Sequence, residues 1–353
     1  MTQRVQPARP ALRGGLFALA AALLFGASTP LMQRFGVGAG SFWVAALLYA
    51  GAAAIGFMSL QPAVREARLT LADLPRLTLM AAVGAALAPV LLVWGLTQTS
   101  GVSASLLLTL EAVFTVLLAR AFYGEQMDRR VVTALVLLTG GGAMLVLDQA
   151  HASGGMRALG ALAVLGATAA WGLDNSLSRA LSARDPSQVV LGKSLLGALA
   201  TAGLAAALGQ PLPSATATFG LLATGAIGYG LSLRLYLLAQ REFGAARTAS
   251  VFAFAPFIGA ALAFALGERG ASAWFAGGAL LMLAGVLLHL MERHAHAHVH
   301  AAQEHEHAHT HGDGHHLHSH DPLPAAAHSH MHRHEPLAHS HPHVPDMHHL
   351  HRH

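Results

Sequence analysis

The sequence contains no cysteine, only one lysine (Lys193) and few charged residues of any kind. The absence of cysteine excludes disulfides, thiolate metal ligands and a cysteine nucleophile. Charged residues make up 11% of the 353 residues, and hydrophobic ones 54%. That charged share is less than half of the roughly 25% found in soluble domains. This composition excludes an ordinary soluble enzyme built around one core.

Long apolar runs fill the chain from Gly14 to Met291. About 20 apolar residues in a helix cross the ~30 Å hydrocarbon layer of a membrane. The runs are rich in alanine and leucine and lack a two-residue alternation, so they predict helices and not a β-barrel. We therefore expect an all-α membrane protein of ten transmembrane helices. The predicted spans are 14–33, 41–60, 75–95, 99–119, 131–149, 157–179, 189–208, 217–239, 247–266 and 273–291.

The arginines predict the orientation, because loops on the cytoplasmic side carry an excess of basic residues. With the N-terminus (residues 1–13) inside, thirteen arginines fall in inner loops and three in outer loops. The outer three are Arg34, Arg157 and Arg269. We expect both termini in the cytoplasm of a bacterium, a multi-pass arrangement in the inner membrane, and a first helix that is not cleaved as a signal peptide.

The ten predicted helices divide into two repeats, 14–149 and 157–291. An aromatic-glycine pair followed by polar residues occurs at Phe25-Gly26 and again at Trp171-Gly172. Later in each half, a cluster of small residues leads through an apolar helix to Gly-Glu and then to a glycine-rich helix. The matching segments are Thr99–Glu125 with Phe243–Glu268, and Leu138–Val146 with Ala276–Val286. Since each repeat has five spans, the second copy is expected upside down in the membrane.

In this doubled order of motifs, the sequence resembles the EamA-type transporters of the drug/metabolite transporter superfamily. The resemblance covers roughly residues 14–291. It implies a carrier of two inverted five-helix repeats that moves a small metabolite by alternating access, through exchange or with an ion. The family usually has a proline in the middle of the fourth helix of each half. Pro256 fills that place in the second half, whereas Glu111 fills it in the first.

Four ionisable residues lie at membrane depth, where a charge costs at least ~2.5–3.5 kcal/mol without a partner or water. Glu111 has no arginine or lysine within two turns, so we expect it to face a cavity and exchange a proton or bind a cation. The alternative is a protonated side chain that only joins two helices. Asp174, Lys193 and Arg234 are expected at similar depth, where they could form an ion-pair cluster at the inner mouth. Alternatively, the two basic side chains extend to the lipid headgroups.

Further candidates are polar residues and prolines within the spans. Thr29 and Asn175 occupy matching places in the two halves and could hydrogen-bond a substrate or merely bridge helices. Pro30, Pro89 and Pro256 should free backbone carbonyls, and such helix breaks often adjoin transporter sites. The sequence shows no nucleophile with a neighbouring base and no phosphate-binding loop, so we expect neither an enzyme nor ATP-driven transport.

The last part of the chain, residues 292–353, is rich in histidine and is expected to be disordered and cytoplasmic. Alternating histidines offer neutral imidazoles that suit zinc, nickel or cobalt. No other cofactor is required. Such a run could also be drifting low complexity or a polycation at acidic pH. The candidate ligands are His294, His296, His298, His300, His305, His307, His309 and His311.

Three functions follow from these features. The first is a secondary inner-membrane transporter of a small metabolite, with the tail as an accessory. The second is a nickel, cobalt or zinc exporter or carrier regulated by the tail. The third is a membrane metal sensor or scaffold that transports nothing. The lipid bilayer is a partner in all three, nucleic acid is not expected, and the sequence leaves open whether the chain forms a homodimer.

Overall fold

The computed structural model describes residues 9–60, 62, 66–123, 127, 129–153, 156–178, 181, 184–243, 248, 251–268, 272–290, 295–300, 303–309, 328–334 and 337–342. Helices account for nearly all of the described residues up to Leu290. The helices of the first half are α1 (Arg9–Phe35), α2 (Ser41–Met58), α3 (Leu74–Met80), α4 (Ala88–Leu96), α5 (Gly101–Leu107), α6 (Glu111–Tyr123) and α7 (Arg129–Ser153). Those of the second half are α8 (Met156–Ser178), α9 (Pro186–Ala207), α10 (Ala215–Thr224), α11 (Ser232–Phe243), α13 (Ala255–Ala265) and α14 (Ala273–Leu290).

Three of the predicted spans are continuous helices that change their winding part-way. A short 3₁₀ turn, η1 (Leu71–Asp73), leads into α3. The third span then passes from α3 to α4 through a π-helical segment, η2 (Ala81–Leu87). The eighth passes from α10 to α11 through another, η5 (Gly225–Leu231). The fourth joins α5 to α6 through a 3₁₀ turn, η3 (Leu108–Leu110). The two π-helical segments lie in corresponding spans of the two halves.

Within the described residues, seven helical stretches are long and apolar enough to cross a membrane. Two shorter apolar helices, Ala255–Ala265 and Ala273–Leu288, lie within the last two predicted spans. The sixth predicted span, α8, has 23 residues and carries Arg157 and Asp174. The structure thus confirms a multi-pass helical membrane protein, and the full count of ten spans stays a prediction.

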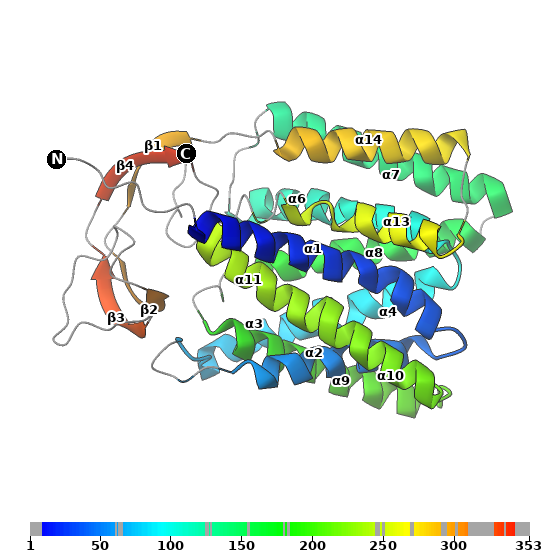
Figure 1. The fold of residues 1–353 in the computed structure, drawn as a ribbon, viewed down its shortest axis with the longest axis horizontal. Coiled ribbons are helices and arrows are strands. Elements are labelled where there is room, and N and C mark those ends of the chain that lie inside the picture. Colours follow the sequence, from blue (N-terminus) through cyan, green and yellow to red (C-terminus); the bar gives the residue numbers. More distant parts are fainter. Residues whose placement is uncertain are drawn as a thin grey trace.

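The two halves pack against each other with matching contacts. In one direction α1 packs on α11 and α13, and in the other α8 packs on α4 and α6. The α2 helix pairs with its counterpart α9, and α7 with its counterpart α14. Figure 1 shows the α7–α14 pair along one edge of the bundle and α2, α9 and α10 along the opposite edge. The helices α1, α4, α6, α8, α11 and α13 lie between these edges, and α9, which carries Lys193, borders them.

Small residues allow these central crossings. A Cβ on Gly26 would lie 2.4 Å from the carbonyl oxygen of Ala255, and one on Gly172 would lie 2.7 Å from Cβ of Phe114. The two aromatic-glycine pairs are therefore close-contact points of α1 with α13 and of α8 with α6. In a membrane, such close packing replaces much of the hydrophobic drive that joins helices in water.

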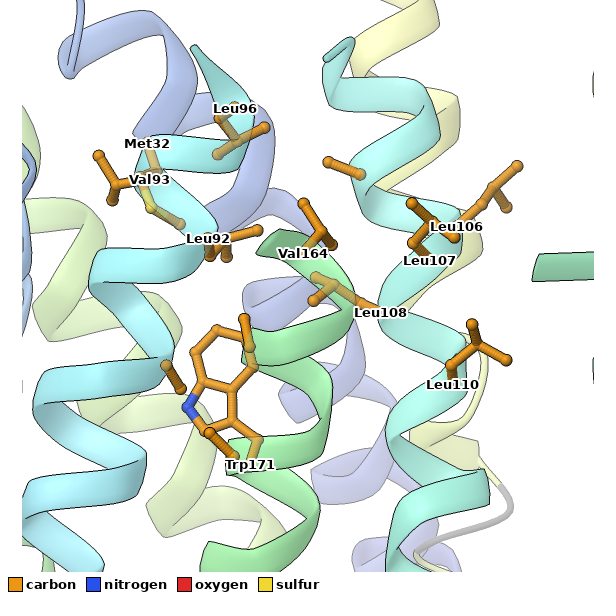
Figure 2. Packing of buried hydrophobic residues seen from close by; sticks show 14 of the residues in the cluster. Met32, Leu92, Val93, Leu96, Leu106, Leu107, Leu108, Leu110, Val164 and Trp171 are labelled. Atoms are coloured by element: carbon orange, nitrogen blue, oxygen red, sulfur yellow. The ribbon is translucent and has the colours of Figure 1, made fainter. Parts of the chain in front are cut away.

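The apolar core lies where the two halves meet. Figure 2 shows Val164 and Trp171 of α8 between Leu92 of α4 and Leu108 after α5. These side chains are all buried; Trp171 is the most exposed of them, at 6%. The core therefore holds α8 at a fixed depth and rotation, which in turn positions the polar residues near its end.

The loop before α9 docks on the other half. Asp185 caps α9 by accepting a hydrogen bond from the Ser187 amide (2.8 Å), and its own amide donates to the Ala67 carbonyl (2.7 Å). Beside it, Arg184 Nε lies 3.0 Å from Asp73 Oδ2. These contacts tie the 6–7 connection to the 2–3 connection at one end of the bundle.

Parts of the histidine-rich tail are described, and the predicted disorder of the tail as a whole stays a prediction. Its described residues form four short strands, β1 (Ala295–His300), β2 (Gln303–His309), β3 (His328–His334) and β4 (Leu337–Pro342). The strands pair antiparallel as β1 with β4 and β2 with β3. The alternation of histidine with other residues has a period of two, which a strand accommodates. The strands lie beyond the end of the bundle at which α1 begins (Figure 1).

Candidate functional site

An ion pair between Asp174 of α8 and Lys193 of α9 lies inside the protein. Lys193 Nζ donates to Asp174 Oδ2, and only 4% of Asp174 and 8% of Lys193 are exposed. The second carboxylate oxygen, Oδ1, is buried and has no hydrogen-bond partner among the described residues. Removing charges from water is costly, so a pair with an unfilled acceptor position suggests a role other than stability alone.

The π-helical segment η2 forms the floor of this ion pair. A Cβ on Gly84 would lie 2.4 Å from Oδ2 of Asp174, so only glycine lets the carboxylate approach. The Ala88 amide donates to the Val83 carbonyl, five residues back. The next donor in that pattern would be Pro89, which has no amide hydrogen. The carbonyl of Gly84 is therefore left without a backbone donor.

Two aromatic side chains from other helices bind this freed carbonyl. Tyr49 Oη of α2 donates to Gly84 O at 2.6 Å, and Trp171 Nε1 of α8 donates to it at 2.9 Å. One carbonyl thus joins the second, third and sixth spans, one turn of α8 away from Asp174. The carbonyl that Pro89 leaves free thereby fixes the position of the ion pair. Such π-helical segments are frequent at functional sites.

The contact at Gly84 yields a testable prediction. We expect Gly84→Ala to displace the Asp174 carboxylate and to lower the free energy of unfolding by about 1–3 kcal/mol, as overpacking does. Thermal unfolding of the purified protein in detergent measures this effect. Gly203→Ala is the matched control, because Gly203 also lies within a helix and a Cβ there would have nothing within 4 Å. An equally stable Gly84→Ala protein would contradict the assigned contact.

Glu111 lies at the first residue of α6 and joins the two halves. Its Oε1 accepts a hydrogen bond of 2.6 Å from Nδ2 of Asn175, on α8. Glu111 is half-buried and Asn175 is exposed. The bond places the lone carboxyl group of the fourth span beside Asp174, the neighbour of Asn175. The structure therefore brings together four of the six predicted cavity residues.

The other two predicted cavity residues lie apart from this group. Thr29 is buried in α1, at the place that matches Asn175. Arg234 is half-buried in α11, and the structure records no ion pair for it among the described residues. Of the predicted cluster of one acid and two cations, the structure records the Asp174–Lys193 pair, and the part of Arg234 stays a prediction. Depth along a helix does not fix rotation about its axis, and α11 packs chiefly on α1.

The remaining prolines behave differently from Pro89. Pro30 lies within α1, which continues unbroken to Phe35. Pro256 occupies the first turn of α13, where a missing amide costs nothing. Glu111 begins α6 in the same way, directly after the 3₁₀ turn η3. The fourth span therefore changes its winding at Glu111, and the ninth begins the helix α13 at Ala255, directly before the matching residue Pro256.

The partners that hold the site were not among the residues predicted from the sequence. Tyr49 and Gly84 gave no signal in the sequence beyond the nearby Pro89. The sequence carried a clearer signal for Ser28. The alignment of Phe25-Gly26 with Trp171-Gly172 also aligns Ser28 with Asp174. Ser28 is buried, and a Cβ on Gly228, in the middle of η5, would lie 2.5 Å from its Cβ. The site of one half is charged and its counterpart is neutral.

The predicted metal ligands divide between strands and undescribed segments. His296, His298 and His300 lie on β1, and His305, His307 and His309 lie on β2. His294 and His311 lie outside the described residues. Among the residues that the structure describes, no three histidine, aspartate or glutamate side chains group closely enough to hold a metal ion.

Comparison with known proteins identifies the family. Residues 12–147 and 158–291 each match the EamA-like transporter family. The chain belongs to the EamA-like transporter family. An uncharacterized transporter from Methanothermobacter thermautotrophicus is 29% identical over 229 residues, which are 63% of this chain and 66% of that protein. The chain therefore spans just under two thirds of the length of this relative.

The fold of this EamA-like protein also has a counterpart among solved structures. One crystal structure of a protein superposes with a TM-score of 0.57 at 18% identity, covering 78% of this chain and 94% of that one. At this identity the likeness concerns the fold alone. The two EamA-like matches coincide closely with the repeats predicted from the motifs, and the Glu111–Asn175 bond joins one repeat to the other.

Proposed function

We propose that this EamA-like protein is a secondary transporter of the bacterial inner membrane. It moves a small metabolite by alternating access between two inverted repeats of five spans, with both termini in the cytoplasm. The observation that carries the proposal is the polar group Glu111, Asn175, Asp174 and Lys193, in which the Glu111–Asn175 bond joins the two repeats within the predicted spans. The distribution of arginines supports the orientation.

Each member of the polar group has a proposed role. Glu111 exchanges a proton or binds the cationic part of a solute, because its bond to Asn175 leaves the carboxyl group half-buried. The Asp174–Lys193 pair gates the path or selects an anionic group, because Oδ1 of Asp174 is an unfilled acceptor. Thr29 and Arg234 contribute from α1 and α11 in another state of the cycle.

A solute and metal uptake screen tests the proposal. The full chain would be compared in right-side-out and inverted membrane vesicles with vesicles that lack it. We expect uptake or exchange of at least one small organic solute that depends on the chain. If vesicles with the chain took up every solute no faster than vesicles that lack it, transport would be refuted. The same screen gives the direction of transport and the coupling ion.

The second candidate function is transition-metal transport, and the register of the tail strands favours it. In the β2–β3 pair, His305 lies opposite His332, His307 opposite His330, and His309 opposite His328. In the β1–β4 pair, His296 lies opposite His341 and His298 opposite His339. Opposite Cβ atoms in antiparallel strands are about 4.5–5.5 Å apart, a spacing that lets two imidazoles bind one ion. We propose that the tail binds zinc, nickel or cobalt through such pairs.

Removal of residues 294–353 should abolish metal binding by the purified protein, because these residues hold 23 of the 25 histidines. Equilibrium dialysis with zinc or nickel measures the bound metal. His151→Ala is the control, because His151 lies in α7, outside the tail, where its ring bonds Leu147 O and stacks on Trp274. Equal metal content with and without the tail would exclude the tail as the binding segment. Altered metal uptake by tail-less vesicles would favour the metal carrier over the metabolite carrier.

A further inference from the structure

A carboxylate from the second repeat caps a helix of the first. Glu268 follows α13, and Gly267 before it has φ +106°, a conformation that turns the chain out of the helix and favours glycine. The turn brings Glu268 Oε2 within 3.0 Å of the Val102 amide, which donates to it from the first turn of α5. The first amides of a helix have no partner within it, so an anionic acceptor is stabilising there.

The ends of several helices converge on this contact. A Cβ on Gly101 would lie 3.1 Å from Oε1 of Glu268 and 2.2 Å from Oε1 of Gln33, at the end of α1. Gln149 of α7 extends the network, since its Nε2 donates to Ser103 Oγ (3.1 Å) and its Oε1 accepts from Thr99 (3.2 Å). Glu268, Gly101 and Gln33 therefore close this end of the bundle between α1, α5 and α13.

Burial along the fourth span differs between its two ends. Every residue from Gly101 to Leu110, next to Glu268, is buried. From Glu111 to Leu118 only Val113 is buried, and Arg120, Ala121 and Phe122 are exposed. The same span is thus enclosed by protein at the Glu268 end and less enclosed beyond Glu111. This is the asymmetry expected of a carrier whose path is shut on one side.

We propose that Glu268 is the gate of this end. Its bond to the Val102 amide holds the two repeats together, and its release opens the path from that end toward Glu111. The inference rests on the alternating access proposed above. The Gly-Glu motif alone did not reveal a gate, because the motif is also typical of a simple helix end. A charge-assisted bond of this kind changes a two-state population about tenfold or more when it is lost.

The natural absence of cysteine gives a clean test. Ala104 is fully buried two residues beyond Val102 in α5, so Ala104→Cys should react slowly with a membrane-impermeant maleimide added from the Glu268 side. Adding Glu268→Ala should speed this labelling about tenfold or more, and Glu268→Gln should have a smaller effect.

The matched control is Asp148→Asn. Asp148 accepts a hydrogen bond from Ser272 at the same end, and none joins it to α5 among the described residues, so its loss should leave labelling unchanged. Unchanged labelling of the folded Glu268→Ala protein would overturn the proposal, as would equal acceleration by Asp148→Asn.

A second pair of variants covers the case in which Glu268→Ala does not fold. Val102→Cys with Glu268→Cys should cross-link through a short bifunctional thiol reagent, and the cross-link should stop solute exchange until it is cleaved. Exchange that continues through the cross-linked protein would overturn the gate. The labelling of Ala104→Cys needs no solute. An empty uptake screen with accelerated labelling would therefore count against transport, while normal uptake with unchanged labelling would count against the gate.

Discussion

Replacement of Glu111 by glutamine should reduce solute flux in vesicles about tenfold or more. Glutamine has nearly the same size and keeps an oxygen that can accept the Asn175 hydrogen bond of 2.6 Å. It cannot ionise, so it neither carries a proton nor pairs with a cation. Coupling between an ion and a solute is typically worth 1–3 kcal/mol, or about 5–150-fold. The loss of flux would therefore report the charge and not the packing.

The control for Glu111→Gln is Glu66→Gln, which neutralises a half-buried carboxyl group outside the predicted spans. That protein should transport normally. Metal binding by the tail should be the same in both variants, because Glu111 lies in α6 and not in the tail. If the Glu111→Gln protein kept its full solute flux, the Glu111–Asn175 bond would serve only to join two helices. Loss of metal binding together with flux would instead indicate a misfolded protein.

Much of the architecture could be predicted from the sequence. Apolar length gave the helices, and the doubled motifs gave the two repeats that the family matches now confirm. For Asp174 and Lys193 the sequence allowed two interpretations, since similar depth permits an ion pair but the lysine could also extend to the headgroups, and the structure has the ion pair. These features depend on composition and spacing, which a sequence states directly.

The arrangement around Gly84 could not be predicted in the same way. A π-helical segment has the composition of the α-helix around it, so η2 and η5 gave no periodicity of their own. Pro89 indicated that a carbonyl would be freed, but the identity of its new partners, Tyr49 and Trp171, depends on how α2 and α8 rotate. The same kind of rotation leaves Arg234 without a recorded ion pair among the described residues. The rotation of a helix about its own axis depends on tertiary packing, and the depth of a residue in the membrane does not specify it.

The strand pairing in the tail could not be predicted from the sequence either. Its low apolar content predicted no core, and this favoured disorder over regular structure. The alternation of histidine, used above only as a source of ligands, is also the pattern of a strand. The observed pairing of β2 with β3 aligns histidines from two segments that residues 310–327 separate in the sequence. Only the partner strand could reveal that alignment.

The largest effect on stability is expected at Lys193. Lys193→Met keeps the length and apolar stem of the side chain but leaves the Asp174 carboxylate buried without its cation. Breaking a buried pair in this way costs about 3–5 kcal/mol, whereas replacing both partners is often close to neutral. Asp174→Asn with Lys193→Met should therefore recover most of the lost stability. Thermal unfolding in detergent of the single and double variants measures the coupling between the two sites.

This double-mutant cycle also separates structure from function at the ion pair. If the pair only stabilises the fold, the double variant should regain both stability and flux. If the pair gates the path, it should regain stability alone, because two neutral side chains cannot alternate between each other and a charged solute. A Lys193→Met protein as stable as the parent would contradict the buried pair, and a double variant no more stable than Lys193→Met would contradict its coupling to Asp174.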